Sequence, residues 1–220
     1  MRTMLCAAVA ALLAVAPASA DWSGFYIGGS LGAGWSDSSL RFVPPSTPAG
    51  PFGANAEGVT YGAHIGGAYQ FGNWLVGLEG SLRDGDLDSA TSCDVGNDDV
   101  CSVDIDHLTV ATVRAGWAMG DLLITVSGGY AEARFDLARR VDPGTLNPDP
   151  SFGSFKHSGY ETGAAIEKRL TDNFALGLEY QHIGLNDDEA RIVRINDGAS
   201  ARFRHEVDLD LVHVRASFLF

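Results

Sequence analysis

The last nine residues of the chain alternate between apolar and polar side chains. One face carries Val212, Val214, Ala216, Phe218 and Phe220, and the other carries His213, Arg215 and Ser217, with Leu219 as the exception. A period of two residues is that of a β-strand. A tilted strand of about 9–11 residues can cross a bilayer, and lipid on one side with a polar interior on the other explains both faces. An edge strand of a soluble β-sandwich is the alternative that this segment alone leaves open.

Similar alternation recurs in eight segments of about ten residues or more. Seven of them cover residues 24–36, 59–71, 103–119, 122–136, 157–169, 174–185 and 204–220, and the remaining one, third in chain order, begins at residue 74. Three connections are tight, around residues 72–73, 120–121 and 171–173, and four are long, at 37–58, 87–102, 137–156 and 186–203. Short turns at one end and long loops at the other are typical of outer-membrane barrels. The sequence therefore predicts an all-β, eight-stranded, antiparallel, up-and-down transmembrane barrel with short periplasmic turns and long extracellular loops.

Large aromatic residues gather at the ends of the segments that adjoin the tight turns. They are Phe71, Trp74, Trp117, Phe174 and Phe220. Aromatic side chains prefer the membrane–water boundary, so these residues predict a girdle on the periplasmic side. No later segment has the ~18 consecutive apolar residues of a transmembrane helix.

The start of the chain has the features of a secretory signal peptide. Arg2 precedes an apolar run, and Ala18-Ser19-Ala20 fits the small-x-small cleavage pattern. We expect residues 1–20 to be removed and residues 21–220 to form the barrel domain. Loss of Arg2 would change the net charge from −13 to −14, and such acidity argues against a nucleic-acid partner.

Several charged residues fall on the inward face by alternation. These are Glu79, Arg114, Glu167, Glu179 and Arg215, with His64 and His213 as further candidates. Side chains fill the interior of an eight-stranded barrel, and buried charges must be paired. We therefore predict a carboxylate–arginine network that plugs the lumen. The alternative is a narrow, cation-preferring pore.

The sequence offers weak candidates for catalysis and metal binding. His157-Ser158 and His182 come nearest to a lipid-modifying site with a histidine, a serine and an acidic residue, but no spacing closes such a constellation. Asp84, Asp86 and Asp88 begin an acidic stretch, yet Ser89 and Val95 stand where an EF-hand loop needs Gly and Glu. We expect no catalytic residues, no metal site and no cofactor.

Several short motifs are spaced along the mature chain: Trp22-Ser23-Gly24-Phe25-Tyr26-Ile27-Gly28-Gly29, Gly77-Leu78-Glu79-Gly80, Thr112-Val113-Arg114-Ala115-Gly116, Leu178-Glu179-Tyr180 and the terminal Phe220. In their order and spacing they resemble the small porin-like outer-membrane proteins of alphaproteobacteria. The resemblance implies an eight-stranded barrel like those of OmpA and the opacity proteins, a place in the outer membrane and, for several members, a role as surface antigen. It also implies that Phe220 is the assembly signal.

These observations favour a structural, surface-exposed envelope protein that is not an enzyme. The first alternative is a narrow cation-preferring porin, and the second is a lipid A-modifying barrel enzyme. The expected partners are outer-membrane lipid and lipopolysaccharide, the barrel assembly machinery, and host or surface ligands that contact the loops.

Two cysteines remain after signal cleavage, Cys93 and Cys101. In an exported protein this spacing predicts a disulfide in the second surface loop. It should stabilise the loop locally, by at most ~2–3 kcal/mol in the chain-entropy model. Thiol labelling of the denatured, unreduced mature protein should find no reactive thiol, and two labelled thiols would contradict the prediction.

Overall fold

The computed structural model describes residues 21–42, 52–85, 88–92, 100–140, 151–194 and 200–220. Their strands are β1 (Gly24–Phe42), β2 (Phe52–Phe71), β3 (Trp74–Gly85), β4 (Asp88–Ser92), β5 (Val100–Met119), β6 (Leu122–Arg140), β7 (Ser151–Thr171), β8 (Phe174–Arg194) and β9 (Ser200–Leu219). The predicted signal peptide lies outside the described residues. In the part of the chain that is described, no helix is long and apolar enough to cross a membrane.

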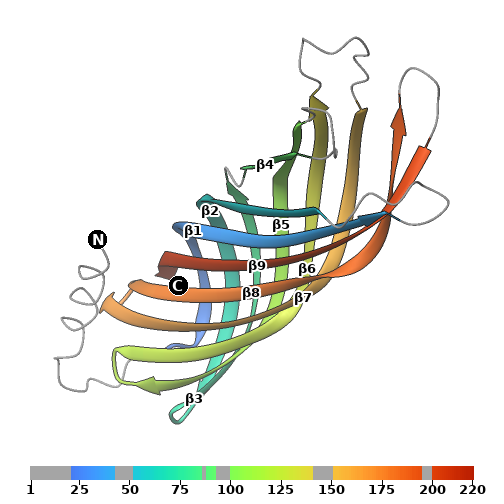
Figure 1. Cartoon of the computed structure of the whole chain (residues 1–220). Coiled ribbons are helices and arrows are strands. Elements are labelled where there is room, and N and C mark those ends of the chain that lie inside the picture. The colour runs from blue at the N-terminus through green and yellow to red at the C-terminus, as the bar shows by residue number, and fades with distance from the viewer. Residues whose placement is uncertain (1–20, 43–51, 86–87, 93–99, 141–150, 195–199) are drawn as a thin grey trace.

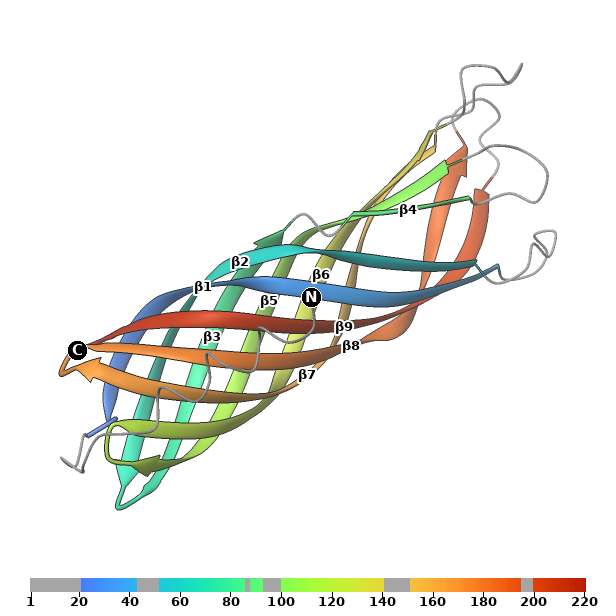
Figure 2. The same cartoon turned by 60° about the vertical axis from the view of Figure 1, so that its left-hand side comes forward.

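The strands close into one antiparallel barrel (Figures 1 and 2). Apart from β3 and β4, strands that are neighbours in sequence pair with each other, and β1 pairs with β9 to close the wall. Both β3 and β4 pair with β5, so together they occupy the position of one strand, and the barrel counts as eight-stranded. The predicted fold class, an eight-stranded up-and-down barrel, is confirmed.

The register of the strands sets the tilt and the width of the barrel. Successive Cα partners around the wall run from Gly28 through His64, Ser81, Val110, Ala131, Gly159, Leu185 and Val207 to Ser38. The circuit thus returns to β1 ten residues further along. For eight strands, this shear implies a tilt of roughly 40°, within the usual range of membrane barrels.

The two faces of the wall follow the alternation in the sequence. On β1, Phe25, Leu31 and Trp35 point outward with 75%, 60% and 42% of their surface exposed, whereas Tyr26 points inward and is 6% exposed. Ten residues separate Phe25 from Trp35, which corresponds to about 25 Å along the membrane normal at the usual rise and tilt. That is the height of the apolar band expected of an outer-membrane barrel. The predicted periplasmic girdle lies exposed at the short-turn end.

The strands extend further than the alternation predicted. Residues 37–42 and 52–58 were expected in the first long loop, but they continue β1 and β2 as a paired hairpin. Residues 186–194 and 200–203 likewise belong to β8 and β9. Beyond the bilayer, both faces of a hairpin meet water, so backbone pairing continues without the alternation that marks a membrane strand. Figure 2 shows these hairpins extending well past the upper end of β3.

An arginine on the outer wall will test the membrane assignment. Leu31→Arg places a charge midway along the band and should cost about 2–4 kcal/mol of unfolding free energy, because the charge must leave water. Val59→Arg, close to the level of Trp35, should cost about 0–1 kcal/mol. Urea unfolding in lipid vesicles will measure both. Equal effects at the two depths would contradict the assignment.

Candidate functional site: the barrel lumen

The segment that precedes β1 folds across the periplasmic mouth. The Trp22 indole is 3% exposed, and its Nε1 donates a hydrogen bond to the carbonyl of Gly120, 3.1 Å away in the β5–β6 turn. The Trp22 amide donates to Oε1 of Gln70 (2.8 Å). Arg169 stacks over the indole at 4.8 Å from the ring centroid and donates to the carbonyl of Asp21 (2.6 Å). Hydrogen bonds from Ser23 hold the pKa of the Asp21 carboxyl below its ordinary value.

Trp22 forms the base of an apolar layer inside the barrel. The layer contains Trp22, Tyr26, Leu75, Ala118, Leu123, Ala175 and Leu219. Leu219, the exception to the terminal alternation, therefore points inward because this layer receives it. A cavity of about 20 Å³ separates the layer from Arg114 and Glu167, which is room for about one water molecule.

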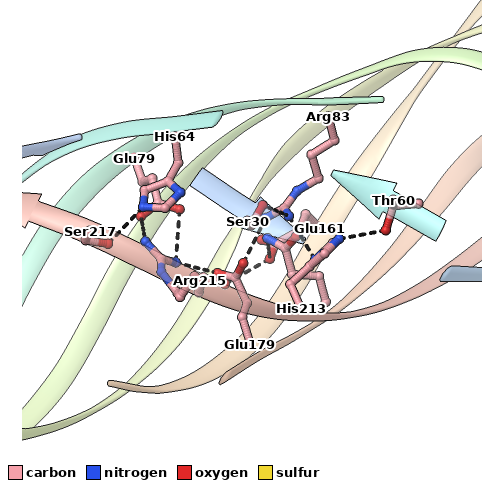
Figure 3. A network of polar contacts seen from close by, with 12 residues as sticks. Ser30, Thr60, His64, Glu79, Arg83, Glu161, Glu179, His213, Arg215 and Ser217 are labelled. Carbon is pink, nitrogen blue, oxygen red and sulfur yellow. Dashed lines mark hydrogen bonds and ion pairs between the residues drawn. The ribbon is translucent and has the colours of Figure 1, made fainter. Parts of the chain in front are cut away.

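The five charged residues predicted to face inward meet above this layer. The Arg215 guanidinium lies 2.6 Å from a carboxylate oxygen of Glu79 and 2.6 Å from one of Glu179 (Figure 3). Arg114 lies 3.0 Å from Glu79 and forms a second ion pair with Glu167. All five side chains are at most 6% exposed. Each arginine thus bridges carboxylates on other strands.

Arg83 is a sixth member that the sequence analysis missed. Its Nη2 lies 2.9 Å from Glu179, and its Nη1 donates to Ser30 Oγ (3.1 Å) and to Nδ1 of His213 (2.9 Å). Since arginine can only donate, Nδ1 is an acceptor, and Nε2 therefore donates to Thr60 Oγ1 at 2.8 Å. Arg83 continues the alternation of residues 77, 79 and 81, which was the signal that could have identified it.

Three arginines and three glutamates make the network neutral, so each buried charge has a partner of opposite sign. Such balance removes most of the penalty for burying ions in the lumen. Further polar contacts surround the core of the network: Tyr26 donates to Glu79 (2.9 Å), Arg114 donates to Thr125 (2.9 Å), and His64 pairs with Ser217 (2.9 Å).

Inward glycines make room for these large side chains. A Cβ added at Gly66 would lie 2.4 Å from atoms of the Tyr26 ring, and one added at Gly28 would lie 2.4 Å from Nε2 of His64. Both separations are far below van der Waals contact. The glycine-rich first and second strands therefore hold the space that the network occupies.

Glu161 is a fourth buried carboxylate outside this balance. It is 1% exposed and accepts hydrogen bonds at Oε1 from Ser127 (2.9 Å) and Gln181 (3.0 Å). Its Oε2 and the Oε1 of Gln181 have no hydrogen-bond partner among the described residues. The arginine–glutamate ion pairs of the network join other carboxylates and leave Glu161 aside.

Apolar side chains are common on the inner face toward the extracellular side. Those at most 5% exposed are Leu108, Val110, Ala131, Ala133, Ile183, Leu185, Val207, Leu209 and Leu211. Buried polar residues lie among them, since Leu108 is the Cα partner of Arg83, Ile183 of Glu161 and Leu209 of Ser36. The charged network is therefore bounded by an apolar layer on the periplasmic side and by a mixture of apolar and polar side chains on the extracellular side.

The other predicted residues are not brought together. His157 points into the lumen and is 1% exposed, whereas His182 lies on the outer wall, where its Nδ1 is 3.0 Å from Asp210. The two histidines are on opposite faces of the wall and cannot share one catalytic site. No group of three potential metal ligands occurs among the described residues. Cys93 lies outside them, so the disulfide stays a prediction.

The terminal Phe220 joins the closing seam of the barrel. Its amide donates to the carbonyl of Phe25 (3.0 Å), and its ring packs edge to face on Phe218 with centroids 5.2 Å apart. Its role as an assembly signal stays a prediction.

A closed barrel with a lipid-facing apolar band and a polar, filled lumen defines the class of outer-membrane β-barrel proteins. The chain belongs to the outer membrane protein β-barrel domain family, whose sequence model matches residues 4–203. It is therefore a protein of the outer membrane. None of the curated protein sequences matches this chain.

Solved structures resemble the chain in fold. OprG from Pseudomonas aeruginosa has a TM-score of 0.58 at 13% identity, over 92% of this chain and 98% of that one. The outer membrane protease OmpT from Escherichia coli has 0.57 at 8% identity, over 90% and 97%. A major outer membrane protein of Thermus thermophilus has 0.54 at 11% identity, over 86% and 99%. At these identities, the likeness concerns the fold alone.

Two substitutions will test how charge is balanced in the lumen. Arg114→Met leaves Glu79 and Glu167 each with one fewer cation and should lower the unfolding free energy by roughly 3–5 kcal/mol. Glu161→Gln should be neutral or stabilising, because the new amide can donate to Oε1 of Gln181 and removes a buried charge that lies outside the balanced network. Urea unfolding in detergent micelles will measure both. An unchanged midpoint for Arg114→Met would refute the network.

Proposed function

We propose that this protein is a closed, non-enzymatic structural barrel that displays its extracellular hairpins and loops at the cell surface. One observation carries the proposal: three buried arginines and three buried glutamates pair across the lumen, above an apolar layer. An ion would have to displace arginine–carboxylate pairs and also cross the apolar layer on the periplasmic side. Each of these two barriers opposes conduction.

The placement of the candidate catalytic residues supports a role without catalysis. His157 and His182 face opposite sides of the wall, so the two histidines do not act on one substrate. The surface loops then become the parts of the molecule that contact partners. We propose host or surface ligands as those partners and the barrel assembly machinery as a transient partner that reads Phe220.

Single-channel recording in planar bilayers will test this function. The wild-type barrel should give no steady conductance steps. Trp22→Ala, which opens only the periplasmic layer, should also stay silent because the charged network remains. A deletion strain should show envelope fragility or altered adhesion rather than loss of a nutrient.

Two results would redirect the proposal. Reproducible conductance steps that Glu179→Gln abolishes would favour a narrow cation-preferring channel. Release of fatty acid from lipid A that depends on His157 or His182 would indicate an enzyme.

A further inference from the structure

Three basic side chains form one row across neighbouring strands on the outer wall. Arg134 of β6 is the direct Cα partner of His107 on β5 and of Lys156 on β7. A register shift in β5 falls directly before His107. All three residues are exposed. We call His107, Arg134 and Lys156 the basic row.

The basic row lies immediately beyond the apolar band. Arg134 is twelve residues above Leu122, the first residue of β6, which is about 30 Å along the membrane normal at the usual rise and tilt. On the same face, the directly paired Tyr130 and Tyr160 lie four residues below Arg134 and Lys156. Tyrosines favour the interfacial region of a membrane. The basic row is therefore at the level of the outer-leaflet headgroups.

Local carboxylates only partly neutralise the basic row. Glu132 accepts an ion pair from Lys156 at 2.5 Å, and Asp84 lies 3.6 Å from the His107 ring. Arg134 and Lys156 are like charges on directly opposed residues, an arrangement that destabilises a sheet. Glu132 supplies one carboxylate beside these two cations. A further anion beside Arg134 would therefore be stabilised.

The opposite side of the rim has the reverse charge. Asp37 and Asp208 are direct partners on β1 and β9, and Glu57 and Asp210 each lie opposite Trp35. The whole chain is also strongly acidic. Arg134 and Lys156 thus lie across the barrel from this acidic group, with a pair of aspartates, Asp104 and Asp136, directly above them. An anionic headgroup would bind at the basic row itself.

We propose that the basic row binds the phosphate groups of a phosphorylated glycolipid of the outer leaflet. The guanidinium of Arg134 can donate two parallel hydrogen bonds to a phosphate, and Lys156 adds a point charge beside it. The acyl chains would lie along the apolar wall below, against Tyr130 and Tyr160. A lipid fits better than a soluble anion because the basic row is continuous with the lipid-facing band. The proposal holds whether or not the lumen conducts.

Binding of diphosphoryl lipid A to the refolded barrel in phosphatidylcholine nanodiscs will test the proposal. The wild type should bind diphosphoryl lipid A more tightly than dephosphorylated lipid A. The double variant Arg134→Gln/Lys156→Gln should bind diphosphoryl lipid A about 30-fold more weakly, since each of the two cations contributes about 1 kcal/mol near a membrane surface. Glu132→Gln should bind it at least as tightly as the wild type, because Lys156 loses its competing carboxylate.

Lys168→Gln is the matched control. It removes a lysine from the periplasmic end of β7, at the other leaflet, and should leave binding unchanged. A heat-modifiable band on dodecyl sulfate gels will establish that each variant is folded. Equal binding of the two lipids, full binding by the double variant, or an equal loss in the Lys168 variant would each overturn the proposal. Competition by equimolar inorganic phosphate would also overturn it, in favour of a free-anion site.

Discussion

In the hydrocarbon of a bilayer, an unpaired backbone N–H or C=O has no water to bond, and the rest of this structure depends on that constraint. The wall must close on itself, so β1 pairs with β9 and no edge remains within the membrane. Closure with ten residues of shear then sets the tilt and the narrow bore. Once both are set, each strand has one face toward lipid and one toward a lumen that side chains must fill.

Because the lumen is narrow, its charged side chains reach one another and hold the strands together by ion pairs. Arg215 on β9 contacts carboxylates from β3 and β8, and Arg114 on β5 contacts one from β7. The network therefore links strands that are far apart in sequence and across the barrel. Exchange of a whole buried ion pair for apolar groups is often tolerated in proteins, but removal of one member leaves a buried charge without its partner. The six side chains are at most 6% exposed, so bulk water does not relieve that penalty.

Because the interior is filled, the charged side chains that can meet other molecules lie on the outer rim, and they differ between its two sides. Arg134 and Lys156 are paired on one side of the rim, and Asp37 and Asp208 are paired on the opposite side. These side chains lie at the level where the apolar wall gives way to headgroups. A barrel of this kind would interact with its surroundings through the rim and the loops, whereas its lumen serves stability.

The sequence by itself determined the membrane strands, their two faces and five of the six charges of the network, because a period of two in the membrane reports directly which environment each residue meets. It could not determine where strands end above the bilayer, as with residues 37–42, since there both faces are hydrated. It also left Trp22 and Glu161 without a role. Only the register of the closed barrel decides which strands lie opposite one another, and hence that Trp22 reaches Gly120, that Arg83 reaches Glu179, and that His107, Arg134 and Lys156 align.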